Sequence, residues 1–249
     1  MDAGYACRMG VPGFIRELVL HRDRVETFDA YPYCIPAIRS LHTLPLCATL
    51  TIFVGENGTG KSTFLEAIAR LAGLDPEGGS RGFHRAPQAP EAPLHEAMQL
   101  IRSTRRERSA FFLRAETMFN LATEVNELGL AEYGWEDLHT KSHGEAFLWT
   151  VQNRLHGNGL YVFDEPESAL SPQRQLSLLV LLHDLASRGA QIVMATHSPI
   201  LMAYPGALIY ELTDTGIAEA AYEQLESVNV MRNFLASPER MLQALFAPA

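Results

Sequence analysis

The chain has 249 residues, 47% of them hydrophobic, which is enough for one large domain or for a domain with an additional lobe. No apolar run approaches the ~18 to 20 residues that cross a bilayer, and the N-terminus lacks the pattern of a secretory signal. A formal net charge of −9 gives no indication of a surface built for nucleic acid, because phosphate binding depends on Lys and Arg.

Two local features bear on location and partners. The three cysteines, Cys7, Cys34 and Cys47, have no metal-type spacing, so we expect reduced thiols and a cytoplasmic location. The basic run at residues 102–109 favours a solvated helix end, and a nucleic-acid patch is the alternative.

Hydrophobic patterns along the chain predict strands that alternate with helices. The pattern in "FIRELVL" predicts a first strand, and "ATLTIFVGENG" predicts a second strand that runs into glycines. A helix is expected from Ser62 to near Gly73, followed by a long Gly- and Pro-rich loop at residues 75–93. Residues 94–138 read as mostly helical, interrupted by a short strand in "SAFFLRAE".

The second half of the chain repeats this alternation. Helices are predicted in "HGEAFLWTVQNRL" and "PQRQLSLLVLLHDLAS", and buried strands in "LYVFDEP" and "AQIVMATHSP". A final strand pair is expected in "ALIYEL" and "GIAEAAY", and the tail from Ser227 is helical, with Pro238 at a helix start. Such alternation predicts an α/β fold with a mostly parallel sheet, which binds ligands at the carboxyl ends of its strands. Residues 1–249 read as a single domain with a helical lobe inserted at approximately 75–158.

The segment "GENGTGKST", residues 55–63, fits the pattern G-x-x-x-x-G-K-[ST] between a predicted strand and a predicted helix. Glycines let the backbone curl so that successive N–H groups point at phosphate oxygens. The helix dipole and Lys61 add positive charge, and the Ser62 hydroxyl can bind Mg²⁺. A chance glycine turn of this pattern is expected in roughly one chain of this length per hundred, so the segment predicts a nucleotide phosphate site.

Two carboxylates, Asp164 and Glu165, follow four apolar residues in "LYVFDEP". A buried strand that ends beside the phosphate site would supply Asp164 as an oxygen ligand for Mg²⁺. Glu165 would accept a proton from the attacking water, because partial burial raises its affinity for protons. The alternative is an ordinary acidic helix start.

His197 ends another apolar strand, in "VMATHSP". A single histidine is more often structural than functional. Its position at a strand end after the acid pair favours a hydrogen bond to the γ-phosphate or to the attacking water.

The stretch "TKSHGEAFLW" contains Ser142 followed three residues later by Glu145, which is the pattern of a helix capping box. The positive N-terminus of such a helix can also bind an anion. The sequence therefore leaves two interpretations of Ser142: a structural cap, or half of a site that a second molecule completes.

Four segments in this order, "GENGTGKST", "SHGEAF", "LYVFDEPESALSP" and "MATHSP", resemble the ATP-binding-cassette (ABC) ATPase superfamily over residues from about 14 to 212. They are similar in particular to small stand-alone ATPases related to the SMC and RecF branch. The resemblance implies a P-loop NTPase of the ABC type, with a mostly parallel core sheet, an antiparallel β portion and a helical lobe. It also implies ATP and Mg²⁺ as cofactors.

The resemblance assigns roles to the residues that match its motifs. Asp164 and Glu165 would be the Walker B acids, residues 168–172 the D-loop, and His197 the switch histidine. The signature motif would lie at residues 142–145, where Ser142, Gly144 and Glu145 would contribute to the ATP site of a second copy. The Walker A loop would consist of Gly55, Asn57, Gly58, Thr59, Gly60, Lys61, Ser62 and Thr63.

The sequence departs from the family pattern in three places. The signature reads "SHGE" in place of the typical "SGGQ", so His143 replaces a glycine. No glutamine stands clearly at the Q-loop, where Glu116, as a metal ligand, or Arg114 is the candidate within "FFLRAETMF". No adenine-stacking aromatic is evident: packing in the core is the favoured interpretation of each candidate, namely Phe28, Tyr31 and Tyr33.

Together these observations predict an enzyme that hydrolyses ATP and acts as an ATP-dependent dimerising switch. We expect a homodimer with two ATP molecules at its interface and a protein partner of unknown identity. The 81 positions from Lys61 to Ser142 (142 − 61) contain no heptad run, which excludes a long coiled-coil arm. The alternatives are a nucleotide-binding subunit of an ABC transporter and a nucleotide-gated regulator with negligible turnover.

Overall fold

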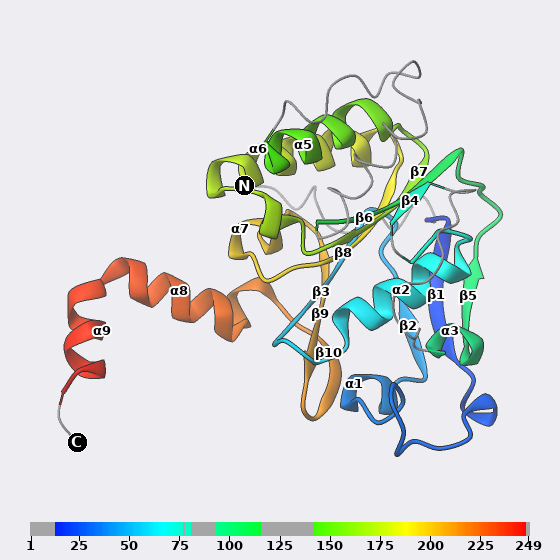
Figure 1. Ribbon diagram of the computed structural model, residues 1–249, viewed down its shortest axis with the longest axis horizontal. Helices are drawn as coiled ribbons and strands as arrows, with labels where there is room; N and C mark the ends of the chain where they lie inside the picture. The colour runs from blue at the N-terminus through cyan, green and yellow to red at the C-terminus, as the bar shows by residue number, and fades with distance from the viewer. Residues whose placement is uncertain (1–12, 77, 81–92, 116–141, 248–249) are drawn as a thin grey trace.

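The computed structural model of the protein describes residues 13–76, 78–80, 93–115 and 142–247 (Figure 1). The strands are β1 (Ile15–Leu20), β2 (Thr43–Pro45), β3 (Leu50–Gly55), β4 (Gly79–Ser80), β5 (Met98–Arg102), β6 (Ser109–Arg114), β7 (Gly159–Asp164), β8 (Gln191–Ala195), β9 (Leu208–Thr213) and β10 (Gly216–Glu219). The α-helices are α1 (Pro36–Arg39), α2 (Lys61–Leu71), α3 (Leu94–Ala97), α5 (His143–Arg154), α6 (Pro172–Ser187), α7 (Pro199–Met202), α8 (Glu226–Ala236) and α9 (Pro238–Leu245). Short 3₁₀ helices are η1 (Arg22–Arg24), η4 (Pro166–Ala169) and η5 (Tyr222–Gln224).

A seven-stranded sheet in the order β10-β9-β3-β8-β7-β6-β4 forms the centre of the molecule. The five strands from β9 to β6 are parallel, and the edge strands β10 and β4 are antiparallel to their neighbours. The mostly parallel α/β fold predicted from the sequence is therefore confirmed.

Burial on both faces explains the apolar runs of the central strands. All six residues of β7 are buried, and they alternate between two cores: Leu160 and Val162 face one, and Tyr161 and Phe163 face the other. Parallel strands covered on both sides have this continuous apolar pattern because neither face meets water.

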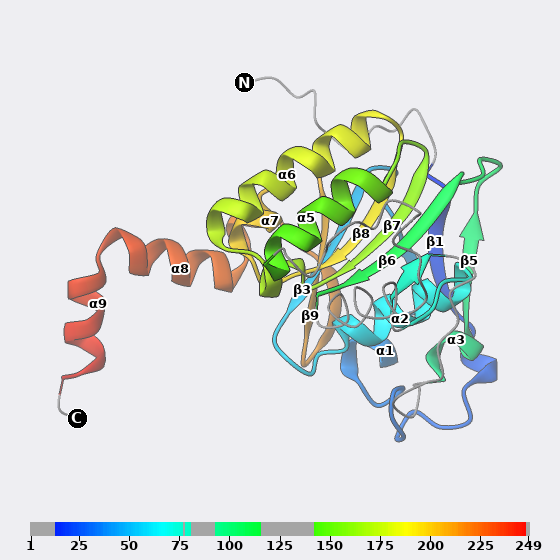
Figure 2. The same ribbon diagram turned by 45° about the horizontal axis from the view of Figure 1, so that its top comes forward.

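Helices cover the two faces of the sheet separately (Figure 2). Helix α2 packs on one face together with a smaller antiparallel sheet in the order β2-β1-β5. Helices α5 and α6 lie side by side over the other face, where they bury Phe147, Val151, Leu178 and Leu182.

A buried glutamine joins the small sheet to the large one. The Gln191 side chain, 0% exposed at the start of β8, donates hydrogen bonds to the carbonyl oxygens of Ile15 (2.7 Å) and Cys47 (2.9 Å). Its Oε1 accepts a hydrogen bond from the Ile15 N–H at 2.9 Å. One side chain therefore satisfies three backbone groups that lie outside the ladder of the large sheet.

Two expectations about the middle of the chain are wrong. Residues 98–102, expected to be helical, form β5, which pairs antiparallel with β1. The loop expected at residues 75–93 contains the short strand β4, which pairs with β6. In both cases pairing with a distant strand overrides a weak local pattern. Residues 116–141 lie outside the described part of the chain, so the helical lobe stays a prediction.

The cysteines differ from the expectation of three reduced thiols. Cys34 is free and exposed, whereas Cys47 is in a disulfide. An odd number of cysteines does not prevent two of them from pairing. The expected cytoplasmic location stays a prediction.

Within the described residues, no helix combines the length and the apolar character needed to cross a membrane.

Replacing Gln191 with leucine is expected to destabilise the fold by about 3 kcal/mol, because the backbone groups of Ile15 and Cys47 would remain buried without partners. Urea denaturation followed by circular dichroism measures this loss. The matched control is Gln173→Leu on the exposed surface of α6, for which a change within about 0.5 kcal/mol is expected. Equal stability of the two variants would contradict the role of Gln191.

Candidate functional site

Three adjacent parallel strands bring the sequence motifs together at the carboxyl ends of the strands of the large sheet. β3 ends at Gly55, where the glycine-rich loop starts, and β7 ends at Asp164. β8 lies between them and ends two residues before His197. Because the strands are parallel, all three motifs lie at their carboxyl ends, where ligands of such sheets bind.

The glycine-rich loop, residues 55–60, has the conformation of a phosphate cradle. Gly58 and Gly60 have φ angles of 82° and 98°, in the left-handed region that glycine adopts without steric cost. Internal hydrogen bonds stabilise the loop, since Thr59 Oγ1 donates to the Glu56 carbonyl oxygen at 2.8 Å. The loop leads directly into α2, whose N-terminal N–H groups and dipole favour an anion at this position.

The Lys61 ammonium is held inside this loop. Its Nζ donates hydrogen bonds to the carbonyl oxygens of Gly55 (3.0 Å) and Glu56 (2.9 Å), and only 3% of the residue is exposed. Burial lowers the pKa of Lys61, and the nearby carboxylates of Glu165, Asp164 and Glu167 partly offset this shift. A phosphate group would add the negative charge that stabilises the buried ammonium.

A hydrogen bond connects the loop to the end of β7. Ser62 Oγ donates to Asp164 Oδ1 at 3.1 Å, across 102 positions of sequence. Burial raises the pKa of Asp164 to about 6, although the Arg114 guanidinium and the Ser62 hydroxyl act in the opposite direction. Burial therefore disfavours the charged form of Asp164, and a bound cation would stabilise that form.

The chemistry of these two side chains fits Mg²⁺. A hydroxyl and a carboxylate are hard oxygen ligands, and Mg²⁺ usually takes only one or two protein carboxylates, with phosphates and waters completing its shell. No group of three or more metal-binding side chains is found in the described residues. The third predicted ligand, Glu116, lies outside those residues.

Arg114, the alternative candidate at the Q-loop, lies beside the same carboxylate. It ends β6 opposite Asp164 in the strand pairing, and its Nε is 3.5 Å from Asp164 Oδ2. Its Nη1 donates to Glu66 Oε1 at 2.9 Å and to the carbonyl oxygen of Pro76 at 3.1 Å. Arg114 thus positions β6 and α2 around Asp164.

Glu165 has an unusual backbone conformation. Its φ and ψ angles are 46° and 53°, in the left-handed region that residues with a β-carbon rarely adopt. The next residue, Pro166, starts η4, so the chain turns sharply and leaves the Glu165 side chain partly exposed at the sheet edge. Strained residues of this kind cluster at functional sites.

His197 faces Glu165 across the site. Its Nε2 is 3.4 Å from Glu165 Oε1, and this buried nitrogen makes no hydrogen bond within the described residues. A buried nitrogen without a partner costs free energy unless a ligand or a water satisfies it. The predicted acid pair and the predicted histidine therefore lie together, with one polar atom available for a ligand.

Glu167 is a residue that the sequence analysis missed. Its Oε2 accepts a hydrogen bond from Thr196 Oγ1 at 2.7 Å, and its Oε1 accepts one from the His197 N–H at 2.5 Å. These bonds fix the segment after β7 to the segment after β8, so Glu167 orients His197. The sequence did offer one indication of this role, namely a second carboxylate two positions after Glu165 in "DEPES".

The segment that resembles the signature motif forms a capped helix. Ser142 is the N-cap of α5, and its N–H donates to Glu145 Oε2 at 2.8 Å, as in a capping box. Arg174, another residue missed from the sequence, donates to Ser142 Oγ at 3.0 Å and to Glu145 Oε1 at 2.9 Å. The structure therefore contains the predicted helix cap, and the capping residue Ser142 is exposed.

Gly144 has a steric reason to be glycine. A β-carbon at this position would lie 2.7 Å from the Ala169 carbonyl oxygen and 2.9 Å from Arg174 Nη1. The start of α5 therefore packs directly against η4 and the start of α6. Within the described residues, no hydrogen bond connects Ser142 or Gly144 to residues 55–63.

The three aromatic candidates for adenine stacking behave differently. Phe28 and Tyr33 pack against the core and contact each other edge to face, as expected. Tyr31 does not pack in the core: 62% of the residue is exposed, and its hydroxyl is 3.2 Å from Thr63 Oγ1. Tyr31 is therefore the exposed aromatic beside the phosphate loop, and core packing is the wrong interpretation for it.

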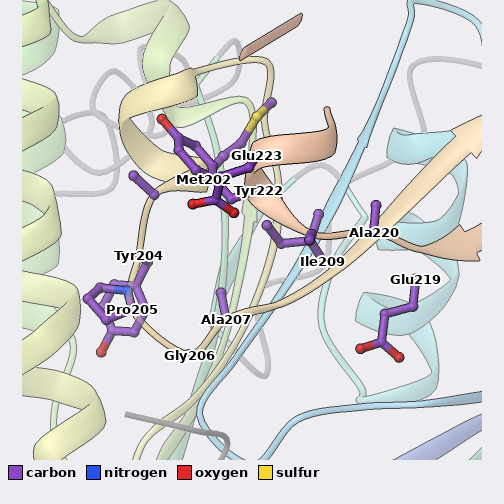
Figure 3. Close-up of a pocket in the computed structure, with 12 residues that line it drawn as sticks. Met202, Tyr204, Pro205, Gly206, Ala207, Ile209, Glu219, Ala220, Tyr222 and Glu223 are labelled. Carbon is purple, nitrogen blue, oxygen red and sulfur yellow. The ribbon is translucent and has the colours of Figure 1, made fainter. Parts of the chain in front are cut away.

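Two cavities border the ends of the sheet. The larger one, about 1160 Å³, is lined by residues 54–59, His197, the end of β9 and the C-terminal helices, so it opens directly onto the phosphate loop. The smaller one, about 590 Å³, lies between the start of β9, where Ala207 and Ile209 line it, and Glu219 to Glu223 (Figure 3). It borders the opposite end of β9 and contains none of the predicted site residues.

The raised pKa of Asp164 gives metal-free protein a characteristic pH dependence. The folded state keeps the Asp164 proton up to about pH 6, whereas the unfolded chain releases it near the ordinary value of 3.8. Because the folded state binds more protons between these values, the contribution of Asp164 to the free energy of unfolding falls as pH rises from about 4 to 6, by about 3 kcal/mol in total.

Asp164→Asn removes this titration, so its unfolding free energy relative to the wild type is expected to rise over this pH range. Urea denaturation at a series of pH values, with a metal chelator present, measures the difference. A constant difference between wild type and variant from pH 4 to pH 7 would contradict the raised pKa.

Comparisons with known proteins find a matching family model and a similar solved structure. The family model described as "AAA domain, putative AbiEii toxin, Type IV TA system" matches residues 140–203, which contain the signature-like segment, the acid pair and His197. A search of solved structures finds the SMC head domain from Thermotoga maritima, 15% identical with a TM-score of 0.45, covering 83% of this chain and 99% of that one.

Curated relatives match the chain over about three fifths of its length. The petrobactin import ATP-binding protein FpuD of Bacillus anthracis is 27% identical over 176 residues, which cover 59% of this chain and 62% of that protein. The iron(3+)-hydroxamate import ATP-binding protein FhuC of Bacillus subtilis (strain 168) is 30% identical over 171 residues, with the same two coverages. The chain thus spans less than two thirds of the length of either relative. Over the matched residues the chain is thus similar in sequence to these import ATP-binding proteins.

Proposed function

We propose that the protein binds and hydrolyses ATP at a site that a second copy of the chain completes, and that it acts as an ATP-dependent dimerising switch. The observation that carries this proposal is the convergence of the phosphate loop, the acid pair and His197 at the carboxyl ends of β3, β7 and β8. The Ser62–Asp164 hydrogen bond joins two of these motifs directly.

ATP binding rests on the loop and on α2. The N–H groups of residues 57–63 and the dipole of α2 bind the phosphates, and Lys61 exchanges its two carbonyl partners for phosphate oxygens. Tyr31, exposed beside Thr63, is the side chain on which the adenine stacks. Ser62, Asp164 and Glu116 would hold Mg²⁺, which neutralises phosphate charge when bound.

Hydrolysis rests on Glu165 and His197. Glu165, partly exposed at the turn after β7, accepts a proton from the water that attacks the γ-phosphate. His197 donates from Nε2 to the γ-phosphate, which satisfies a nitrogen that has no hydrogen bond among the described residues. Glu167 keeps His197 in position through its backbone N–H.

The second copy contributes the N-terminus of α5. Ser142 is exposed there and has no bond to the phosphate loop of its own chain, whereas the N-terminal N–H groups and the dipole of α5 favour an anion. We therefore assign Ser142 and Gly144 to the γ-phosphate of the partner's ATP, with Glu145 as the residue that fixes the helix start. Two copies arranged head to tail would enclose two ATP molecules.

Loss of the γ-phosphate would open such a dimer, because it removes the anion that both copies bind. A ligand drives a conformational change only to the extent that it binds one state more tightly, and here ATP binds the closed dimer through two chains rather than one. The opening would act on a protein partner. The SMC-like "ATHSP" ending, the unusual signature and the "EPESALSP" segment favour a stand-alone switch of the SMC and RecF branch.

A second candidate is the ATP-binding subunit of an importer. FpuD and FhuC, both import ATP-binding proteins, favour it. The two candidates share the ATP site and differ in what opening drives. Purification of the protein from its native cells in mild detergent separates them: an importer subunit co-purifies with an integral membrane protein in stoichiometric amount, and a stand-alone switch does not.

Glu165→Gln is expected to reduce ATP turnover by about 10²- to 10⁴-fold while ATP binding changes little, because it removes the proton acceptor and keeps the shape. Phosphate release and fluorescent-nucleotide binding measure the two effects. Glu219→Gln, an exposed carboxamide substitution on β10, is the matched control and retains full turnover. Lys61→Ala is the contrasting variant and loses ATP binding itself. Equal turnover of wild type and Glu165→Gln would favour the third alternative, a nucleotide-gated regulator.

Ser142→Arg is expected to leave ATP binding by the single chain intact and to abolish both ATP-dependent dimerisation and turnover, because the arginine occupies the place of the partner's γ-phosphate. Light scattering with ATP and Mg²⁺ measures dimerisation. Ser187→Arg, at the exposed end of α6, is the control with unchanged behaviour. Full turnover by Ser142→Arg would exclude the composite site.

A further inference from the structure

The last two helices form an arm that the other described residues leave largely exposed. Figures 1 and 2 both show α8 and α9 extending away from the sheet and its covering helices. Val228 is the one buried residue of α8, and α9 buries none. We call residues 226–246 the C-terminal arm.

The C-terminal arm exposes more apolar surface than a solvated helix pair needs. Leu235, Leu245 and Phe246 are 70%, 67% and 77% exposed, and Val230, Met231 and Leu242 are also exposed. Elsewhere in the described residues, large exposed apolar side chains are confined to Tyr31 and to Leu176 and Val180, one turn apart on α6. A concentration of exposed apolar side chains on one part of a molecule indicates an interaction site.

The apolar face of the C-terminal arm borders the ATP site. Val230, Met231, Phe234, Met241 and Leu245 line the cavity of about 1160 Å³ whose other wall is the phosphate loop and His197. A molecule that occupies this cavity therefore contacts both the phosphate loop and this face of the arm.

Charge argues against an anionic membrane as the occupant. The C-terminal arm contains Glu226 and Glu239 against Arg232 and Arg240, so it is neutral and has no basic cluster. Helices that lie on anionic lipid surfaces are rich in Lys and Arg on their polar face.

In the proposed dimer, the second copy brings the exposed apolar residues of its α6, Leu176 and Val180, close to the C-terminal arm. In the proposed function, on which this inference rests, the partner's Ser142 and Gly144 meet ATP at the phosphate loop. Arg174 holds Ser142, and the Ala169 carbonyl oxygen packs on Gly144, so the start of α6 moves with the start of α5. Leu176 and Val180 lie on the next turns of α6.

We propose that the C-terminal arm of each copy packs on α6 of the other copy, so that the two chains exchange arms around the paired ATP sites. The apolar face of α8 and α9 covers Leu176 and Val180 of the partner subunit. The arm contact adds to the binding of ATP, and it closes the cavity beside the phosphate loop.

Sedimentation velocity of full-length protein in a Glu165→Gln background, with ATP and Mg²⁺, tests the arm contact. Leu245→Glu on the arm and Val180→Glu on α6 are each expected to raise the dimer dissociation constant at least 10-fold while fluorescent-ATP binding stays unchanged. The controls Gln243→Glu on α9 and Ser187→Glu at the far end of α6 add the same charge away from Leu245 and Val180, and each is expected to change the dimer dissociation constant less than about two-fold. Circular dichroism verifies that all four variants fold.

Mixing the two defective variants gives the decisive result. A mixed dimer of Leu245→Glu with Val180→Glu has one arm contact with both substitutions and one with neither, so the mixture is expected to dimerise more tightly than either variant alone. A mixture no tighter than its components would overturn the exchange, as would undiminished dimerisation of Leu245→Glu. Arm-dependent binding to phosphatidylcholine vesicles together with undiminished dimerisation would also overturn it.

These outcomes are separable from failure of the proposed function. If the parent protein stays monomeric with ATP and Mg²⁺, the composite ATP site fails and the arm exchange fails with it. If the parent dimerises and Ser142→Arg does not, but Leu245→Glu dimerises normally, the composite site stands and the arm exchange alone is overturned.

Discussion

The parallel pairing of β3, β8 and β7 is the constraint on which the site depends. It places the carboxyl ends of three strands side by side, although these ends are separated by up to 140 positions in sequence (195 − 55). The Ser62–Asp164 hydrogen bond and the contact between Glu165 and His197 are possible only because this register brings their backbones together. Burial of these strands on both faces fixes the register, since a slip of one residue would exchange the two cores.

Two side chains couple segments that lie next to the site. Glu167 connects the turn after β7 to His197, and Arg174 connects α6 to the start of α5. The first connection fixes His197 beside Glu165, and the second keeps the exposed start of α5 fixed to η4 and α6. Residues 165–174 therefore contribute to both connections and physically link the carboxyl end of β8 to the start of α5.

Much of this fold could be predicted from the sequence, for a physical reason. Apolar runs that end in glycine, acid or histidine, such as "LYVFDEP", predict both a buried strand and the place where its polar end emerges, and the structure confirms β3, β7, β8, α2, α5 and α6. The contacts of Gln191, Glu167 and Arg174 could not be predicted. Each joins a side chain to a group 29 to 176 positions away, and local periodicity reports which face of an element is buried but not its partner. β5 shows the same limit, because its strand conformation depends on pairing with β1.

Glu165 has a consequence for how this protein could change over time. A residue with a β-carbon pays roughly 1–2 kcal/mol for a left-handed backbone, a penalty that glycine avoids. Selection for thermal robustness alone would therefore favour glycine at position 165, and the chain would gain heat resistance as it lost its carboxylate. The turn after β7 therefore sets thermal stability against retention of the Glu165 carboxylate, and a directed-evolution experiment that screened only for survival on heating would enrich variants that lack this side chain.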